Sequence, residues 1–106
     1  MGEAPTISTH VLDTQLGEPA RGVVVDLYRL LGEVEERVGE GTTDDDGRIA
    51  RLLDGELQPG TYRISFELDG PFFRRASLTF VVSDVSRSYH VPMLVAPYSL
   101  ASYRGS

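Results

Sequence analysis

Hydrophobic and polar residues alternate along most of this chain. The clearest case is residues 61–68, where apolar side chains at positions 62, 64, 66 and 68 share one face and polar side chains share the other. Such alternation predicts a β-strand with one face buried and the other in water. Residues 77–82 repeat the pattern. Residues 22–30 contain more apolar side chains, which predicts a strand that is covered on both faces.

Further strands are predicted at residues 6–12, 36–42, 49–52, 88–95 and 100–103. Turn-forming residues separate these segments, among them Gly17, the Asp-Asp-Asp-Gly run 44–47, Pro59-Gly60 and Gly70-Pro71. Seven or eight short strands at this spacing predict a β-sandwich or β-barrel. No long helix is predicted, although residues 51–57 have room for a helical turn. We therefore expect a single all-β domain over residues 1–106.

Composition narrows the possible functions. The chain has 106 residues, of which 41% are hydrophobic and 25% charged, as in an ordinary folded domain. A net charge of −6 argues against binding to nucleic acid or to an anionic membrane. The absence of cysteine excludes disulfides, thiolate zinc sites and cysteine nucleophiles. No apolar run reaches the roughly 18 residues that a membrane span needs, and no secretory signal is apparent, so we expect a cytoplasmic protein.

Two histidines, His10 and His90, are the only side chains whose ordinary pKa lies near neutrality. Both lie in predicted strands, where a histidine is more often a packing or surface residue than a catalyst. Together with the Asp44–Asp46 run they form an alternative candidate metal site. Two histidines without cysteine are too few ligands for a typical zinc site, so we expect no bound metal. Consecutive aspartates cannot all point at one calcium ion, so this run is better explained as a tight acidic turn.

Arg48 follows that turn directly and, on spacing alone, is a surface arginine. The segment Tyr103-Arg104-Gly105-Ser106 follows a predicted strand. Physical reasoning alone favours a frayed end here. The alternative is a packed tail that presents a phenol, a guanidinium and a hydroxyl together.

Several segments, in order along the chain, carry a more specific signal. They are Ile-Ser-Thr-His-Val-Leu-Asp-Thr at 7–14, Leu-Gly-Glu-Pro-Ala at 16–20, Thr-Asp-Asp-Asp-Gly-Arg at 43–48, Gly-Thr-Tyr-Arg at 60–63 with Phe-Phe at 72–73, and Tyr-His-Val-Pro-Met-Leu-Val-Ala-Pro-Tyr at 89–98 with Tyr-Arg-Gly-Ser at 103–106. This set resembles the motifs of the transthyretin-like 5-hydroxyisourate hydrolase family over essentially the whole chain.

The resemblance implies a transthyretin-like β-sandwich of two four-stranded antiparallel sheets. It also implies a homotetramer, a dimer of dimers, with active sites at the interface between dimers. The implied reaction is cofactor-free hydrolysis of a small purine-derived substrate, 5-hydroxyisourate, to 2-oxo-4-hydroxy-4-carboxy-5-ureidoimidazoline in urate degradation.

By the same resemblance, His10, Arg48 and His90 are the catalytic residues, and His10, Arg48, Tyr103 and Ser106 bind the substrate. Imidazole suits a general base at neutral pH, and an arginine is a permanent cation that stabilises developing negative charge. The arginine also keeps a neighbouring imidazole neutral by like-charge repulsion. Which histidine is the base stays open at this point.

The sequence departs from the family pattern after the strand at 61–68. Asp69-Gly70-Pro71 stands where the family has about a dozen more residues with a short helix, so that helix is expected to be missing. The main alternative is a non-catalytic transthyretin-type carrier that binds a small aromatic ligand between dimers. A sugar-binding or adhesive sandwich is a third possibility, disfavoured by the absence of tryptophan.

Overall fold

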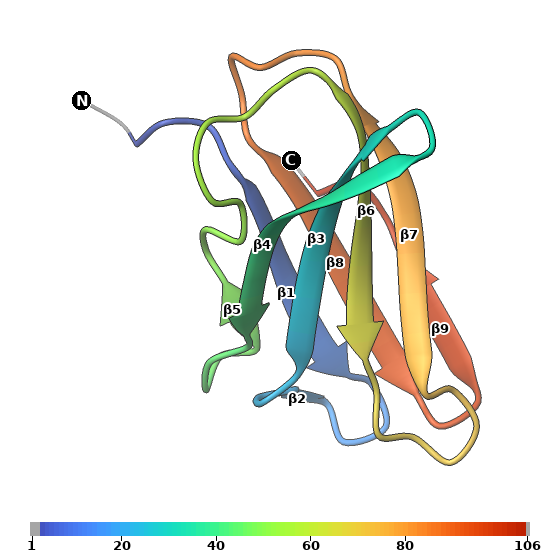
Figure 1. Ribbon diagram of the computed structural model, residues 1–106. Coiled ribbons are helices and arrows are strands. Elements are labelled where there is room, and N and C mark those ends of the chain that lie inside the picture. Colours follow the sequence, from blue (N-terminus) through green and yellow to red (C-terminus); the bar gives the residue numbers. More distant parts are fainter. Residues whose placement is uncertain (1–2, 106) are drawn as a thin grey trace.

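The computed structural model describes residues 3–105 and consists of β-strands joined by turns and loops (Figure 1). The strands are β1 (Ile7–Asp13), β2 (Glu18–Pro19), β3 (Val24–Leu31), β4 (Val34–Thr42), β5 (Arg48–Ile49), β6 (Gly60–Glu67), β7 (Arg75–Val82), β8 (Tyr89–Ala96) and β9 (Ser99–Ser102). Among the described residues there is no helix, and so none that could span a membrane.

The strands form two sheets that pack face to face (Figure 1). The β6 sheet has the order β4-β3-β6-β7, and all its neighbouring strands are antiparallel. The β1 sheet has β1, β8 and β9 in that order, and the two-residue strands β2 and β5 both pair with β1. The predicted two-sheet, all-β fold is therefore confirmed.

The β1 sheet differs from the expectation in two details. Counting β2 and β5 it has five strands, and β1 runs parallel to β8, with Ile7 opposite Tyr89 and Asp13 opposite Val95. Residues 18–19, which directly follow the predicted turn residue Gly17, form β2. The strand predicted at 49–52 is shorter, because Leu52 turns inward and donates its backbone N–H to the carbonyl of Ile7 at 2.9 Å.

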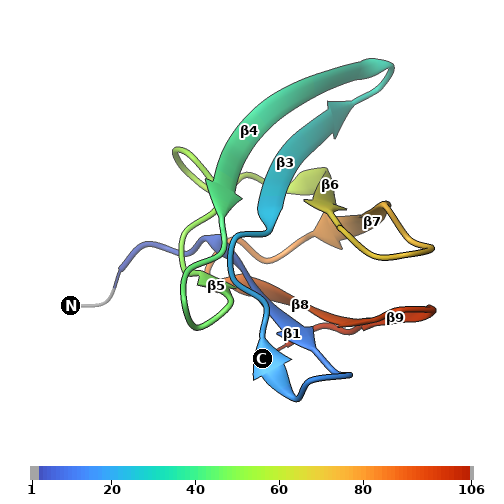
Figure 2. The ribbon, with the colours of Figure 1, turned by 90° about the horizontal axis from the view of Figure 1, so that it is seen from below.

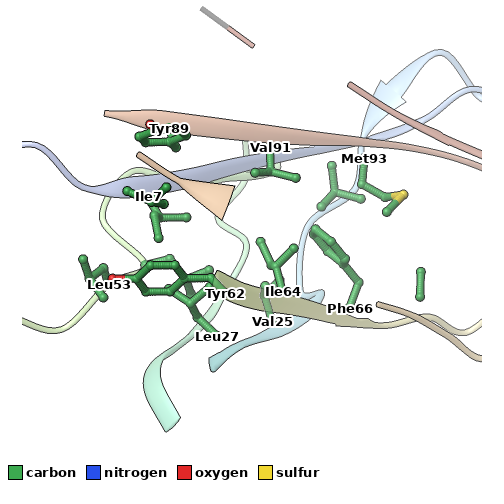
Figure 3. Close-up of a cluster of buried hydrophobic side chains, with 14 of the residues drawn as sticks. Ile7, Val25, Leu27, Leu53, Tyr62, Ile64, Phe66, Tyr89, Val91 and Met93 are labelled. Atoms are coloured by element: carbon green, nitrogen blue, oxygen red, sulfur yellow. The ribbon is translucent and has the colours of Figure 1, made fainter. Parts of the chain in front are cut away.

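The core lies between the two sheets and comes from the apolar half of the alternating pattern (Figure 3). The side chains with no exposed surface are Ile7, Val11, Val25, Leu27, Ile64 and Phe66. Removing such a side chain from water stabilises the fold by about 1.5–3 kcal/mol each. Because every second residue of β1, β6 and β8 is used in this way, the remaining residues of these strands face outward.

The expectation that β3 is covered on both faces is wrong. Val25 is fully buried, whereas its neighbour Val24 is 40% exposed. The valines of this segment lie alternately on the inner and the outer face of β3. Among the described residues, no third layer covers the outer face. Beyond a bulge between Leu27 and Tyr28, the β3–β4 hairpin curves away from the rest of the sandwich (Figure 2).

The connections leave little room for additional elements. Asp69-Gly70-Pro71 belongs to a short loop that leads from β6 to β7, closed by a 3.0 Å hydrogen bond from the backbone N–H of Leu68 to the carbonyl of Arg74. No helical turn forms at residues 51–57 either. That segment instead places Leu52, Leu53 and Leu57 in the core.

Candidate active site

His10 and Arg48 lie side by side on the outward face of the β1 sheet. Antiparallel pairing places His10 of β1 opposite Arg48 of β5. Directly paired residues send their side chains out of the same face of a sheet. Thr9 and Val11, which flank His10 in the chain, are buried on the inner face, so half-buried His10 faces outward.

The loop before β5 is a tight acidic turn that sets the position of Arg48. One carboxylate oxygen of Asp44 accepts hydrogen bonds from the backbone N–H groups of Asp46 at 2.9 Å and of Arg48 at 3.0 Å. Gly47 has a φ of +74°, and a Cβ there would collide with the backbone carbonyl of Val11. The acidic turn predicted from the sequence is confirmed, with the Asp44 carboxylate bonded to the turn itself.

His90 reaches the same face from β8. Parallel pairing places His90 opposite Ser8, and the Ser8 hydroxyl oxygen lies 2.8 Å from Nδ1 of His90. His10 is two residues beyond Ser8 on β1 and therefore shares its face. The parallel strand pair thus brings both histidines of the chain together, although 79 residues lie between them in the sequence.

The electrostatics of His90 reflect these neighbours. Partial burial lowers the pKa of His90 below its usual 6.5, and the positive charges of Arg48 and His10 lower the pKa further. Desolvation and nearby cations both disfavour the imidazolium form. His90 is therefore neutral at neutral pH. Arg48 contributes to this lowering in the expected direction, although burial is the larger cause.

A depression of about 390 Å³ opens on this face. It is lined by Ser8, Thr9, Arg48, Ile49, Ala50, Ser88 and His90. Among residues 3–105 no carboxylate pairs with the exposed guanidinium of Arg48. A small polar molecule in the depression would meet a fixed cation, a neutral imidazole and a hydroxyl group.

The segment after β9 is packed, contrary to the frayed end that physical reasoning alone favoured. The backbone N–H of Gly105 donates to the carbonyl of His90 at 2.8 Å, and the two residues form an isolated antiparallel bridge. The guanidinium of Arg104 lies over the ring of Tyr89, 4.5 Å from its centre. These contacts bring the tail against β8, beside one of the candidate catalytic residues.

Tyr103 is not placed beside Arg48 within one chain. It is 59% exposed and lines a second, mostly apolar cleft of about 260 Å³ between β7 and the β8–β9 pair. His90 lines both this cleft and the depression that contains Arg48. Ser106, the other predicted substrate-binding residue of the tail, lies outside the described residues.

The alternative metal site does not assemble. Within residues 3–105 no three histidine, aspartate or glutamate side chains gather closely enough to hold a metal ion. The Asp44–Asp46 run lies in the turn before β5, and its first carboxylate is bonded to backbone N–H groups.

Two contributors escaped the sequence analysis as site residues. Ser8 was not singled out, because nothing in the sequence reveals that β1 pairs with β8 or in which register. Asp44 was expected to form a turn, but its hydrogen bond to Arg48 depends on the loop geometry. The Asp-x-x-Gly-Arg spacing, with the carboxylate four residues before the arginine, is a signal that could have identified it.

The fold and this face together define a transthyretin-like β-sandwich with a His–Arg–His cluster on the outward side of one sheet. The family described as HIUase/Transthyretin matches residues 7–105, and this chain belongs to that family.

The chain is similar over its full length to known hydrolases of the family. It is 41% identical over 119 aligned positions to the 5-hydroxyisourate hydrolase of Deinococcus radiodurans, with all of both chains covered. It also superimposes on the structure of Klebsiella pneumoniae 5-hydroxyisourate hydrolase with a TM-score of 0.83 and 37% identity, covering 95% of this chain and 99% of that one.

Sea bream transthyretin in complex with thyroxine has the same fold. The TM-score is 0.85 over 93% of each chain, at 23% identity. At that identity the similarity shows the fold alone. Conclusions about the chemistry of this protein must therefore rest on the arrangement of His10, Arg48 and His90.

Proposed function

We propose that this protein hydrolyses 5-hydroxyisourate to 2-oxo-4-hydroxy-4-carboxy-5-ureidoimidazoline. The observation that carries the proposal is the convergence of His10, Arg48 and His90 on one open face of the β1 sheet. Full-length similarity to proteins named 5-hydroxyisourate hydrolase supports the choice of substrate.

His90 is the general base in this proposal. Its lowered pKa keeps the imidazole neutral at neutral pH, so the ring has a lone pair with which to accept a proton from water. The water oxygen then bonds to the ring carbonyl carbon as its proton passes to His90. When the ring C–N bond breaks, the imidazolium returns that proton to the leaving nitrogen. Water is consumed, and the carbonyl carbon becomes a carboxylic acid that releases its remaining proton to solvent as it ionises to the carboxylate.

Arg48 stabilises the negative charge that develops on the carbonyl oxygen. A guanidinium stays protonated throughout and presents two parallel N–H groups to an oxygen atom or an anionic ring. The Asp44 turn holds the backbone of Arg48 in place before substrate arrives. The side chain of Arg48 therefore starts from a fixed backbone position on the face where the charge develops.

His10 binds the substrate beside Arg48 and, with Tyr103 and Ser106, completes the substrate-binding set. His10 and Arg48 occupy neighbouring strands of one chain. Tyr103 lines a different cleft of the same protomer. The simplest arrangement that brings these groups around one substrate has a second copy of the chain covering the open face.

A homotetramer built as a dimer of dimers supplies that covering chain. The site of a single chain is an open depression in which Arg48 is exposed, and closing it would exclude water and strengthen each electrostatic contact. Light scattering on the purified protein tests this part. A tetramer is expected, and a monomer that still accelerates the reaction would contradict it.

No cofactor enters this reaction, because the steps use only water, an imidazole and a guanidinium. The direct test of the activity is the decay of ultraviolet absorbance of freshly generated 5-hydroxyisourate, with and without protein. The protein should accelerate the decay, and prior incubation with a chelator should leave the rate unchanged. Decay at the spontaneous rate would contradict the proposal and favour the carrier alternative instead.

A further inference from the structure

Two residues contact the imidazole of His90, one on each side of the ring. On one side, the Ser8 hydroxyl oxygen is 2.8 Å from Nδ1. On the other side lies Gly105, where a Cβ would come within 2.5 Å of Cδ2 of His90. Nδ1 and Cδ2 are the two ring atoms bonded to Cγ, so β1 contacts one edge and the tail contacts the opposite edge.

This arrangement fixes the orientation of the ring. Turning it by half a revolution would exchange Nδ1 with Cδ2 and break the hydrogen bond to Ser8. The N–H of Gly105 also bonds to the carbonyl of His90 itself, so the tail stays against the ring. The far edge of the ring, Cε1 and Nε2, is consequently directed away from the strand. No residue between 3 and 105 makes a hydrogen bond to Nε2.

A neutral imidazole has one N–H and one lone pair, and the two nitrogens exchange these roles between tautomers. The Ser8 hydroxyl is able to pair with either form of Nδ1. The two forms differ at the other nitrogen, Nε2, which has no hydrogen-bond partner among residues 3–105, while Arg48 lines the same depression as His90. A guanidinium nearby attracts a lone pair and repels an N–H, which favours the tautomer with its proton on Nδ1.

We propose that Ser8 is a positioning residue that accepts a hydrogen bond from Nδ1–H of His90 and so leaves Nε2 as the nitrogen that takes the proton from water. The inference rests on the proposed function for its catalytic consequence. The tautomer itself is a property of the resting protein, and it is measurable whether or not the protein hydrolyses 5-hydroxyisourate.

The tautomer is tested by nitrogen-15 NMR of the histidine side chains, at about pH 8 where an unperturbed imidazole is neutral. The chain has two histidines, so His10→Gln assigns both sets of signals. In the wild-type protein Nδ1 of His90 is expected to carry the proton and Nε2 the lone pair. Ser8→Ala should give a mixture of tautomers, and Ser8→Thr, which keeps a hydroxyl group, should restore the wild-type signals.

The catalytic consequence is tested on the same variants. Ser8→Ala should lower kcat by about tenfold with little change in KM, a fraction of the roughly hundredfold or more that a general base supplies. Ser8→Thr should recover most of that loss. Ser77→Ala is the matched control, because Ser77 is a strand serine on the outward face of the β6 sheet whose hydroxyl pairs with Ser65 at 2.8 Å. Its kcat should equal that of the wild type.

Two results would overturn the proposal. One is a proton on Nε2 of His90 in the wild-type protein, a result that needs no variant to fold. The other is Ser8→Ala with an unchanged tautomer and unchanged kcat. A wild-type protein that has the expected tautomer but does not accelerate the decay of 5-hydroxyisourate would refute the proposed function and leave the hydrogen bond to Ser8 in place.

Discussion

The arginines on the outward faces of the two sheets differ in their ion-pair partners. On the β6 sheet, arginines pair with carboxylates of the same sheet: Arg75 with the facing Glu67, Arg37 with Asp26 of the adjacent strand, and Arg63 with Glu35 across β3. On the β1 sheet, Arg48 forms no ion pair with any residue from 3 to 105 and has two histidines as neighbours. On the first face the arginines have carboxylate partners, whereas on the second face Arg48 has none within residues 3–105.

This difference has a direct chemical meaning. The Arg63 guanidinium donates to both carboxylate oxygens of Glu35 and lowers the pKa of that carboxyl group, so its hydrogen-bonding capacity is already in use. Within the described part of the chain, no carboxylate occupies the Arg48 guanidinium, and such a group is well suited to an anionic ligand. In this protein the arginine beside imidazoles and a hydroxyl group lines the candidate site, whereas the arginine bound to a carboxylate lies on the other sheet.

The largest expected effect comes from removing either imidazole. His90→Ala and His10→Ala should each lower kcat/KM by at least about a hundredfold, the scale of losing a general base or an electrostatic partner in the transition state. The double variant should lose much less than the product of the two, because groups that act as a unit are not additive. Steady-state kinetics measure this, and circular dichroism checks the fold. Near-wild-type activity in both folded single variants would show that the outward face of the β1 sheet is not the catalytic site.

Replacing the cation without removing its charge sharpens the comparison. Arg48→Lys should also lower kcat/KM by about a hundredfold, because an ammonium group does not reproduce the planar pair of N–H donors. Arg63→Lys on the β6 sheet is the matched control and should keep full activity. Equal activity of the two lysine variants would mean that charge alone suffices at position 48, and that the guanidinium geometry is irrelevant.

Deleting residues 103–106 should have a smaller effect. The deletion removes the N–H donated to His90 and the contact of Arg104 with Tyr89, but the strands that form the core end before it. One hydrogen bond contributes about 0.5–1.5 kcal/mol, and Tyr103 and Ser106 of the proposed substrate-binding set are lost as well, so kcat/KM should fall by roughly tenfold or more while the sandwich stays folded. Circular dichroism and the kinetics of the truncated chain check this. Loss of the folded signal would show that the tail supports the sheet rather than the site.

The smallest expected effect is a shift in pH dependence. Since burial, Arg48 and His10 lower the pKa of His90, kcat/KM should stay on its plateau to a pH below 6.5 and fall only as the imidazole becomes protonated. In the unfolded chain the pKa returns to its ordinary value, so the unfolded state binds the proton first. The folded state should therefore lose stability as the pH falls below about 6.5.

Arg48→Ala tests the electrostatic part of that shift. Removing the guanidinium should move the acidic limb of the residual activity to higher pH, since one cause of the lowered pKa is gone. A pH–rate profile of the variant, with Arg63→Ala as the control, measures it. An unchanged limb in Arg48→Ala would mean that Arg48 does not act on the titrating group.

Much of the fold was predictable because it follows from a local pattern. The period of two in residues 61–68 gives the buried and exposed faces of β6 directly, and the glycine-rich and proline-rich segments mark the turns. The pairing of β1 with β8 was not predictable in this way. The two strands are distant in sequence, and their register depends on how the whole sandwich closes rather than on any residue within them.

The residues of the candidate site also fall into two groups, those identified from the sequence and those whose role depends on strand pairing. His10, Arg48 and His90 were identified through the family resemblance, and the turn before Arg48 through its own sequence. Ser8 and Gly105 gain their roles from β8, which is local to neither of them. The valine-rich segment that became β3 was misinterpreted as fully covered, because hydrophobicity along a strand does not reveal how many layers the molecule has.

The most direct test of the account compares the two outward faces in a single assay. The ultraviolet decay of freshly generated 5-hydroxyisourate is followed with wild-type protein, with Arg48→Ala and with Arg63→Ala, each verified as folded. The account predicts fast decay for the wild type and Arg63→Ala, and decay slowed by at least about a hundredfold in kcat/KM for Arg48→Ala. Fast decay in all three, or faster decay for Arg48→Ala than for Arg63→Ala, would contradict the assignment of the chemistry to the β1 sheet.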